Sequence, residues 1–157
     1  MRLPSAQISA GAQVADTEPS QDQLAPQATP LRVLYCEDDP IGQDLIEAAL
    51  MAMGHACTRA NDGAQGLALV ASQPFDPVLT DLEMPKVDGY TLLSELRRLQ
   101  QQSGQSRIPV VAVTAHAGPE DRDKFLQLGF DGYLAKPFRM AALGRALKAV
   151  EDQRGAP

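Results

Sequence analysis

The chain has 157 residues, of which 44% are hydrophobic, and its formal net charge is -6 at pH 7. This length allows one ordinary domain and is too short for two. The negative charge argues against a nucleic-acid-binding surface, which would need a basic patch. No apolar run reaches the roughly 18 residues of a membrane-spanning helix, so we expect a soluble, cytoplasmic protein that binds neither nucleic acid nor membrane.

The first thirty residues differ from the rest of the chain. They contain four prolines and five glutamines and show no helical or strand periodicity. Such a segment cannot bury enough apolar surface to offset its chain entropy, and it lacks the apolar stretch of a secretory signal. We therefore predict a disordered Pro/Gln/Ala-rich tail at 1–30, one folded domain at 31–152 and a short polar end at 153–157.

Five short apolar runs, each bounded by polar or helix-breaking residues, predict buried strands. They lie at 31–36, 55–59, around Val78–Leu79 and ending at Asp81, at 108–113 and at 132–135. Helical patterns alternate with these runs. They begin after Asp39-Pro40, after Asn61-Asp62-Gly63, after the 84–89 loop, at Pro119-Glu120-Asp121 and before Met140. We expect Asp39 to cap the first helix, Gly54 and Gly129 to end the first and fourth, and the third to fray at 100–106.

The apolar residues of each helical pattern predict the faces that pack on the sheet. These residues are Ile41, Leu45, Ile46, Ala49, Leu50 and Met53 in the first helix; Ala64, Leu67, Ala68 and Ala71 in the second; Leu92, Leu93, Leu96 and Leu99 in the third; Phe125, Leu126 and Leu128 in the fourth; and Met140, Leu143, Leu147 and Val150 in the last. Strands joined by helical crossovers run parallel, and the crossovers are right-handed. The chain therefore predicts a three-layer α/β domain with helices on both faces of the sheet.

Polar residues stand at the C-terminal ends of four predicted strands. The first strand is followed by Glu37 and Asp38, the third ends in Asp81, the fourth ends in Thr114, and the fifth leads into Lys136. In the strand order 2-1-3-4-5 these four strands are consecutive neighbours, about 4.8 Å apart. The five side chains can therefore converge on one small volume, at the edge where open α/β sheets bind ligands.

Three carboxylates this close repel one another unless a cation joins them. Magnesium prefers oxygen ligands, so Asp38 and Asp81 would bind it, with a backbone carbonyl near Glu83 as a candidate third ligand. Lys136 and Thr114 would supply a positive charge and a hydroxyl donor to a phosphoryl group. Asp81 alone is typical of a loop or helix cap, but in this setting it can attack phosphorus and form an aspartyl phosphate.

The stretch from about Leu31 to Glu151 resembles the receiver domain of two-component response regulators, and in particular the receivers of hybrid histidine kinases. The resemblance rests on Glu37-Asp38, Asp81 with Met84-Pro85 and Asp88-Gly89, Thr114-Ala115-His116-Ala117, Asp131-Gly132-Tyr133 and Lys136-Pro137-Phe138, in this order and at these intervals. It implies a flavodoxin-like (βα)5 fold with a central parallel sheet of order 2-1-3-4-5.

The resemblance also implies a role for each matching residue. Asp81 would be the phosphoacceptor, Glu37 and Asp38 the acidic pair serving Mg2+, and Lys136 the phosphoryl ligand. Thr114 and Tyr133 would be the switch residues. The donor would be a histidine kinase or a histidine phosphotransfer protein. A downstream protein would bind the face of the fourth helix, fifth strand and fifth helix. Such a chain is a signalling module and not an enzyme.

Several alternatives stay open at this stage. A phosphatase with an aspartyl-phosphate intermediate is one, although such enzymes place the nucleophile on the first strand with a second Asp two residues later, where this chain has Pro40. A receiver-like domain that only binds proteins is another. His116 and Glu83 either tune the lifetime of the phosphoryl group or are exposed loop residues. The chain could be free-standing or a fragment of a hybrid kinase. Cys36 and Cys57 are expected to be isolated, buried, reduced thiols.

Overall fold

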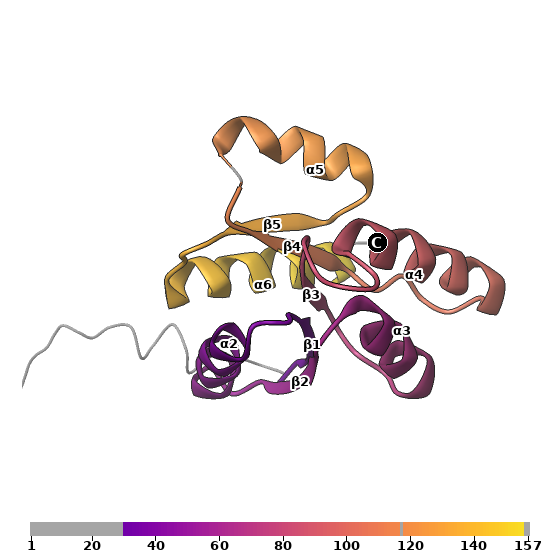
Figure 1. The fold of residues 1–157 in the computed structure, drawn as a ribbon, viewed down its shortest axis with the longest axis horizontal. Helices are drawn as coiled ribbons and strands as arrows, with labels where there is room; N and C mark the ends of the chain where they lie inside the picture. The colour runs from indigo at the N-terminus through magenta and orange to yellow at the C-terminus, as the bar shows by residue number, and fades with distance from the viewer. Residues whose placement is uncertain (1–29, 117, 156–157) are drawn as a thin grey trace, which may run out of the picture. The chain divides into compact units, whose positions relative to one another are not determined.

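The computed structural model of the chain describes residues 30–116 and 118–155. The predicted tail, apart from Pro30, lies outside the described residues. From Leu31 onward the chain forms one compact unit built on a five-stranded sheet of order β2-β1-β3-β4-β5. All neighbouring strands pair in parallel, which confirms the predicted α/β class and strand order (Figure 1). The strands are β1 (Arg32–Cys36), β2 (Ala56–Ala60), β3 (Val78–Asp81), β4 (Val110–Thr114) and β5 (Gly132–Ala135).

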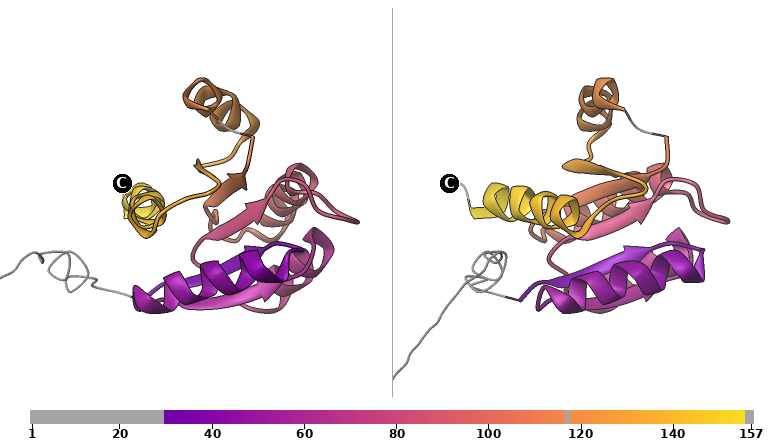
Figure 2. Two further views of the ribbon diagram at one scale, coloured as in Figure 1. Left: turned by 60° about the vertical axis from the view of Figure 1, so that its left-hand side comes forward. Right: turned by 90° about the vertical axis from the view of Figure 1, so that its left-hand side faces the viewer.

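Helices cover both faces of this sheet. In chain order they are α2 (Pro40–Ala52), α3 (Gly63–Ser72), α4 (Gly89–Ser103), the 3-10 turn η2 (Pro119–Asp121), α5 (Arg122–Leu128) and α6 (Met140–Gly155). Figures 1 and 2 show α2 and α6 on one side of the sheet and α3 and α4 on the other. Among the described residues, no helix is both long enough and apolar enough to cross a membrane.

Two apolar cores lie on the two faces of the sheet. Successive side chains of a strand point to opposite faces, so Val33 and Tyr35 of β1 enter one core while Leu34 and Cys36 enter the other. The first core is completed by α2 and α6, and the second by α3, α4 and α5. All five residues of β4 are buried, as expected for a central parallel strand covered on both faces.

The helix ends follow the sequence signals closely. The Asp39 side chain accepts hydrogen bonds from the backbone of Ile41 and Gly42 and caps α2, as predicted. Asp62 and Asp88 cap α3 and α4 in the same way. The third predicted helix does not fray at 100 but continues to Ser103. It ends where Gly104 takes the left-handed conformation, with φ of 72°.

Some predicted helix faces were wrong. In α2, Ile41 and Leu45 are 69% and 66% exposed, and only one stripe of that helix reaches the core. In α3 the buried positions are Gly63, Gly66 and Val70, because the helix packs so closely that only glycine fits at two of them. The following predicted core residues are instead exposed: Ala64, Ala68 and Ala71 of α3, Leu126 and Leu128 of α5, and Met140 of α6.

A charged cluster ties α4 to the N-terminal ends of β4 and β5. The Asp131 carboxylate accepts hydrogen bonds from the Arg97 guanidinium at 2.9 Å and from the backbone N–H of Val110 at 2.8 Å. It also pairs with Arg107. The side chain of Asp131 is only 5% exposed, so its charge depends on these partners for compensation.

Candidate functional site

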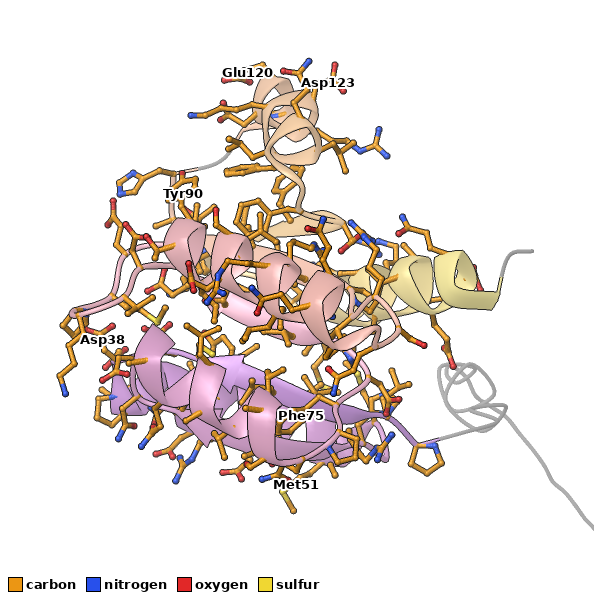
Figure 3. All side chains as sticks on the ribbon, turned by 90° about the vertical axis from the view of Figure 1, so that its right-hand side faces the viewer. Asp38, Met51, Phe75, Tyr90, Glu120 and Asp123 are labelled. Atoms are coloured by element: carbon orange, nitrogen blue, oxygen red, sulfur yellow. The ribbon has the colours of Figure 1, made fainter. Side chains whose placement is uncertain are left out.

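The C-terminal edge of the sheet gathers the predicted site residues. Glu37 follows β1, Asp81 and Thr114 are the last residues of β3 and β4, and Lys136 follows β5 directly. The backbone N–H of Lys136 donates to the Thr114 carbonyl at 2.8 Å, which continues the ladder past the end of β5 and fixes where the lysine side chain starts. Asp38 lies at the same edge of the described domain, beside the loops that follow the strands (Figure 3).

Lys136 joins two of the acidic residues. Its ammonium nitrogen lies 2.7 Å from Glu37 Oε1 and 3.6 Å from Asp81 Oδ2. Glu37 and Lys136 are 99 positions apart in the sequence, so the fold alone brings them into contact. The carboxylates of Glu37, Asp38 and Asp81 each offer an oxygen atom, and these atoms lie within 4.8 Å of one another. The structure therefore brings together four of the predicted residues.

The three carboxylates occupy different environments. Glu37 is buried, Asp81 is half-buried, and Asp38 is exposed. Burial, followed by the charge of Glu37, raises the pKa of Asp81 above its usual value. Burial would also raise the pKa of Glu37, but hydrogen bonds from Lys136 and Tyr35 outweigh it and the pKa is lowered. Ionisation of Glu37 is thus favoured by its surroundings, whereas ionisation of Asp81 is disfavoured.

This cluster fits a hard divalent cation. Two of its three carboxylates are accessible to solvent, all three offer oxygen ligands, and a single lysine leaves part of their charge uncompensated. Oxygen donors at this spacing suit Mg2+, which binds through one or two carboxylates and keeps several waters. Glu83 lies beside the cluster: its side chain is exposed, and its backbone N–H points to Asp81 Oδ1 at 3.5 Å. The Glu83 carbonyl stays a predicted ligand.

Thr114 and Tyr133 make their contacts with the segment after β4. The Thr114 hydroxyl accepts a hydrogen bond from the His116 N–H at 3.1 Å, and the Tyr133 hydroxyl donates to the Gly118 carbonyl at 3.4 Å. The Tyr133 ring lies 5.6 Å from that of Phe125. Among the described residues, no hydrogen bond joins Thr114 or Tyr133 to the acidic cluster, so their roles as switch residues stay predictions.

Two supports of the site went unnoticed in the sequence. The Tyr35 hydroxyl, buried beneath the cluster, donates to Glu37 Oε1 at 2.9 Å. Burial, then the charge of Glu37, raises the pKa of Tyr35, so the phenol stays a neutral donor. The Gln43 amide donates to the Glu37 carbonyl and to Asn61 Oδ1, at 2.5 and 2.8 Å. A hydroxyl-bearing residue in an otherwise apolar strand, two positions before a carboxylate, was the available signal.

Comparison with known proteins agrees with this architecture. Residues 33–148 match the family model described as response regulator receiver domain. A gliding motility regulatory protein of Myxococcus xanthus is 40% identical over 112 residues, which cover 71% of this chain and 14% of that protein. The sensor histidine kinase RcsC of Salmonella typhi is 33% identical over 135 residues, or 86% of this chain and 14% of the kinase. The chain thus spans about one seventh of the length of these relatives.

A solved structure with the same fold also resembles this chain in sequence. It is the receiver domain of sensor histidine kinase PA1611 from Pseudomonas aeruginosa PAO1, with a magnesium ion coordinated in its active-site cleft. The two are 35% identical, with a TM-score of 0.67, and the match covers 78% of this chain and 99% of that domain. The family model spans residues 33–148, and the fold agrees with that of a receiver domain 35% identical in sequence, so the chain belongs to the response regulator receiver domains of two-component signalling.

Proposed function

We propose that Asp81 accepts a phosphoryl group from a phosphohistidine in a Mg2+-dependent reaction. The observation that carries this proposal is the position of Lys136, whose ammonium bridges Glu37 and Asp81 at 2.7 and 3.6 Å. A compact cation beside a carboxylate is placed to pair with a phosphoryl oxygen once that group is attached. Such a chain passes on a conformational state and not a small-molecule product, so we propose a signalling module and not an enzyme.

In the proposed step a carboxylate oxygen of Asp81 attacks phosphorus. The P–N bond to the donor imidazole breaks, its electron pair stays on the ring nitrogen, and a proton from solvent leaves the imidazole neutral. Asp38 and Asp81 would hold Mg2+, together with the carbonyl near Glu83, and Glu37 would serve it from its buried position. The bound ion would neutralise the negative charge that otherwise repels a phosphoryl group. Lys136 would move from Glu37 toward the new phosphoryl oxygens.

An exposed apolar face on α2 supports a protein donor. Ile41 and Leu45 are about two-thirds exposed, and Ala48 and Ala52, which are also exposed, continue the same stripe at helical spacing. The stripe begins at Ile41 in the first turn of α2, three residues after Asp38 of the acidic cluster. We propose that a helix of a histidine kinase or phosphotransfer protein packs on this face and presents its phosphohistidine to Asp81.

Two donors separate the chemistry of the site from the docking of its partner. The wild type is expected to take a phosphoryl group both from acetyl phosphate and from a phosphorylated histidine phosphotransfer protein. Leu45→Asp should slow transfer from the protein donor at least about tenfold, because a buried unpaired carboxylate would oppose docking. The rate with acetyl phosphate should stay unchanged. Equal rates from the protein donor in wild type and variant would remove the docking proposal.

Met51→Asp is the matched control. Met51 is 64% exposed and points away from the sheet (Figure 3), but it lies about a third of a turn around α2 from Leu45. It should leave both rates unchanged.

A lack of labelling of the wild type by either donor would instead contradict the proposed phosphoacceptor role. A further rival, a phosphatase, requires sustained turnover of a small phosphate ester that both Asp38→Ala and Asp81→Asn abolish.

Signal output is proposed for the face made by α5, β5 and α6, the fourth helix, fifth strand and fifth helix of the domain. The Thr114 hydroxyl would move toward the phosphoryl oxygens and lose the hydrogen bond that it now accepts from the His116 N–H. Tyr133 would then give up its hydrogen bond to Gly118 and rotate inward. Each movement replaces one weak hydrogen bond by another contact. The charge of one phosphoryl group is therefore enough to shift the equilibrium between the resting and the signalling conformation.

A further inference from the structure

The Glu37 side chain is fixed on several sides at once. Its Oε1 accepts hydrogen bonds from the Tyr35 hydroxyl at 2.9 Å and from the Lys136 ammonium at 2.7 Å. Its Oε2 accepts the backbone N–H of Asp39 at 3.2 Å. The carboxylate also lies against Gly42, where a side-chain carbon would come within 3.3 Å of Oε1. The carboxylate is therefore folded back over the first turn of α2 and is not free to turn.

These supports differ in how firmly they are held. Lys136 reaches Glu37 through a long, flexible, part-exposed side chain, and the proposed chemistry requires it to move. Tyr35 is 1% exposed, and its ring packs in the core beneath α2 and α6. Side chains two positions apart on a strand point to the same face, which places the phenol directly under the carboxylate. Tyr35 is thus the rigid side-chain support of Glu37.

We propose that Tyr35 is a positioning residue for the metal and phosphoryl site. Its hydroxyl holds Glu37 in the one orientation from which the carboxylate can serve both the divalent cation and Lys136. A phenylalanine would fill the same space in the core, and only the hydroxyl reaches Glu37. Without that hydroxyl, Oε1 loses its fixed donor, and Glu37 follows Lys136 when the ammonium moves. This inference rests on the proposed function, since it concerns the metal on which phosphoryl transfer would depend.

The test compares Tyr35→Phe with the wild type in the whole chain. Calorimetric titration with Mg2+ should show an affinity lowered roughly three- to tenfold, which is about 0.7–1.4 kcal/mol and within the range for the loss of one typical hydrogen bond. Phosphorylation by acetyl phosphate should need correspondingly more Mg2+ for half-maximal rate, while the rate at saturating Mg2+ stays within about twofold of wild type. Tyr90→Phe, at an exposed tyrosine of α4, is the matched control and should change neither quantity.

A second background shows whether Tyr35 acts through Glu37. In Glu37→Gln, the additional change Tyr35→Phe should leave the remaining Mg2+ affinity within about twofold, because the carboxylate to be positioned is gone. Equal losses in the two backgrounds would place the effect elsewhere and overturn the proposal. Unchanged Mg2+ affinity in Tyr35→Phe alone would overturn it as well, and would leave the tyrosine as core filling.

The same two substitutions, singly and together, can be compared without metal, and this comparison tests the role of Tyr35 independently of the proposed function. In the presence of a chelator, Tyr35→Phe should lower the ratio of folded to unfolded protein. We expect this decrease to be at least about threefold larger in the wild-type background than in the Glu37→Gln background. Strict additivity would mean that the hydroxyl does not hold Glu37, and the proposal would fail even if Mg2+ binds. Non-additive effects of the two substitutions in chelator would support the positioning of Glu37 by Tyr35. If the wild type then bound no Mg2+ and took no phosphoryl group, the proposed function alone would be contradicted.

Discussion

Removing the charge of Asp81 should stabilise the metal-free protein. Asp81 carries its charge within 4.8 Å of two other carboxylates, Glu37 and Asp38, and 3.6 Å from one ammonium, that of Lys136. At an effective dielectric constant of about 20, each pair of like charges at 4.8 Å costs about 3.5 kcal/mol, and the attraction to Lys136 returns about 4.6 kcal/mol. The net cost is about 2 kcal/mol, and screening of the exposed Asp38 lowers it to about 1–2 kcal/mol.

Chemical denaturation in chelator measures this cost. We expect Asp81→Asn to raise the free energy of unfolding at pH 7 by about 1–2 kcal/mol, or the melting temperature by about 3–8 °C for a domain of this size. The raised pKa of Asp81 means that the folded state binds a proton at a higher pH than the unfolded chain. Lowering the pH from 7 toward the raised pKa of Asp81 therefore stabilises the wild type. It also narrows the difference in unfolding free energy between the wild type and Asp81→Asn.

Asp123→Asn, at an exposed carboxylate of α5, is the control and should change stability by less than about 0.5 kcal/mol. If Asp81→Asn were no more stable than the wild type at pH 7, or if the gap widened as the pH fell, the electrostatic account of the cluster would be refuted.

Four further changes test the fold that positions the site. Asp131→Ala should lower the free energy of unfolding by about 3–5 kcal/mol in urea denaturation, because it leaves two arginines without their buried counter-charge. A Cβ at Gly89 would lie 2.5 Å from the Asp81 carbonyl oxygen, so Gly89→Ala should lower the free energy of unfolding by about 1–3 kcal/mol and displace Asp81. Gly144→Ala should instead stabilise α6 by about 0.5–1 kcal/mol, because its new carbon meets nothing closer than 3.9 Å. His55 is buried, and that burial lowers its pKa. The free energy of unfolding should therefore fall as the pH drops below about 6.5, because the unfolded chain takes up the proton first. His55→Gln should weaken this pH dependence in the same denaturation assay.

The fold and the four central residues of the site could be predicted from the sequence because both follow from strand ends. A short apolar run fixes where a parallel strand stops, and the first residue beyond it must lie at one edge of the sheet. That rule, together with the strand order 2-1-3-4-5, predicted that Glu37, Asp81 and Lys136 lie close together, and the structure brings them into contact. Asp39 was likewise identified as a cap, since its position before Pro40 leaves few other uses for its side chain.

Helix faces were harder to predict, because apolar spacing does not tell which side of a helix is covered. The stripe through Ile41 and Leu45 has the same periodicity as a core face, yet it is exposed. In α3 the buried face is marked by glycines, which carry no hydrophobic signal at all. At Gly66 an added carbon would lie 2.5 Å from the Cys36 sulfur, so close approach and not hydrophobicity selects the residue.

The support of Glu37 by Tyr35 could not be predicted because it depends on side-chain direction and depth. A tyrosine in a buried strand is usually taken as core packing, and only the position of its hydroxyl separates the two roles. That position depends on how α2 and α6 pack against β1, which no local pattern in the sequence specifies.

The most direct test of the central claim is peptide mapping of the protein after incubation with acetyl phosphate and Mg2+. The account predicts a single added phosphoryl group, carried by the peptide that contains Asp81, absent when a chelator removes the metal, and much reduced in Lys136→Ala. A phosphoryl group on any other residue, or the same yield at Asp81 in chelator and in Lys136→Ala, would contradict it.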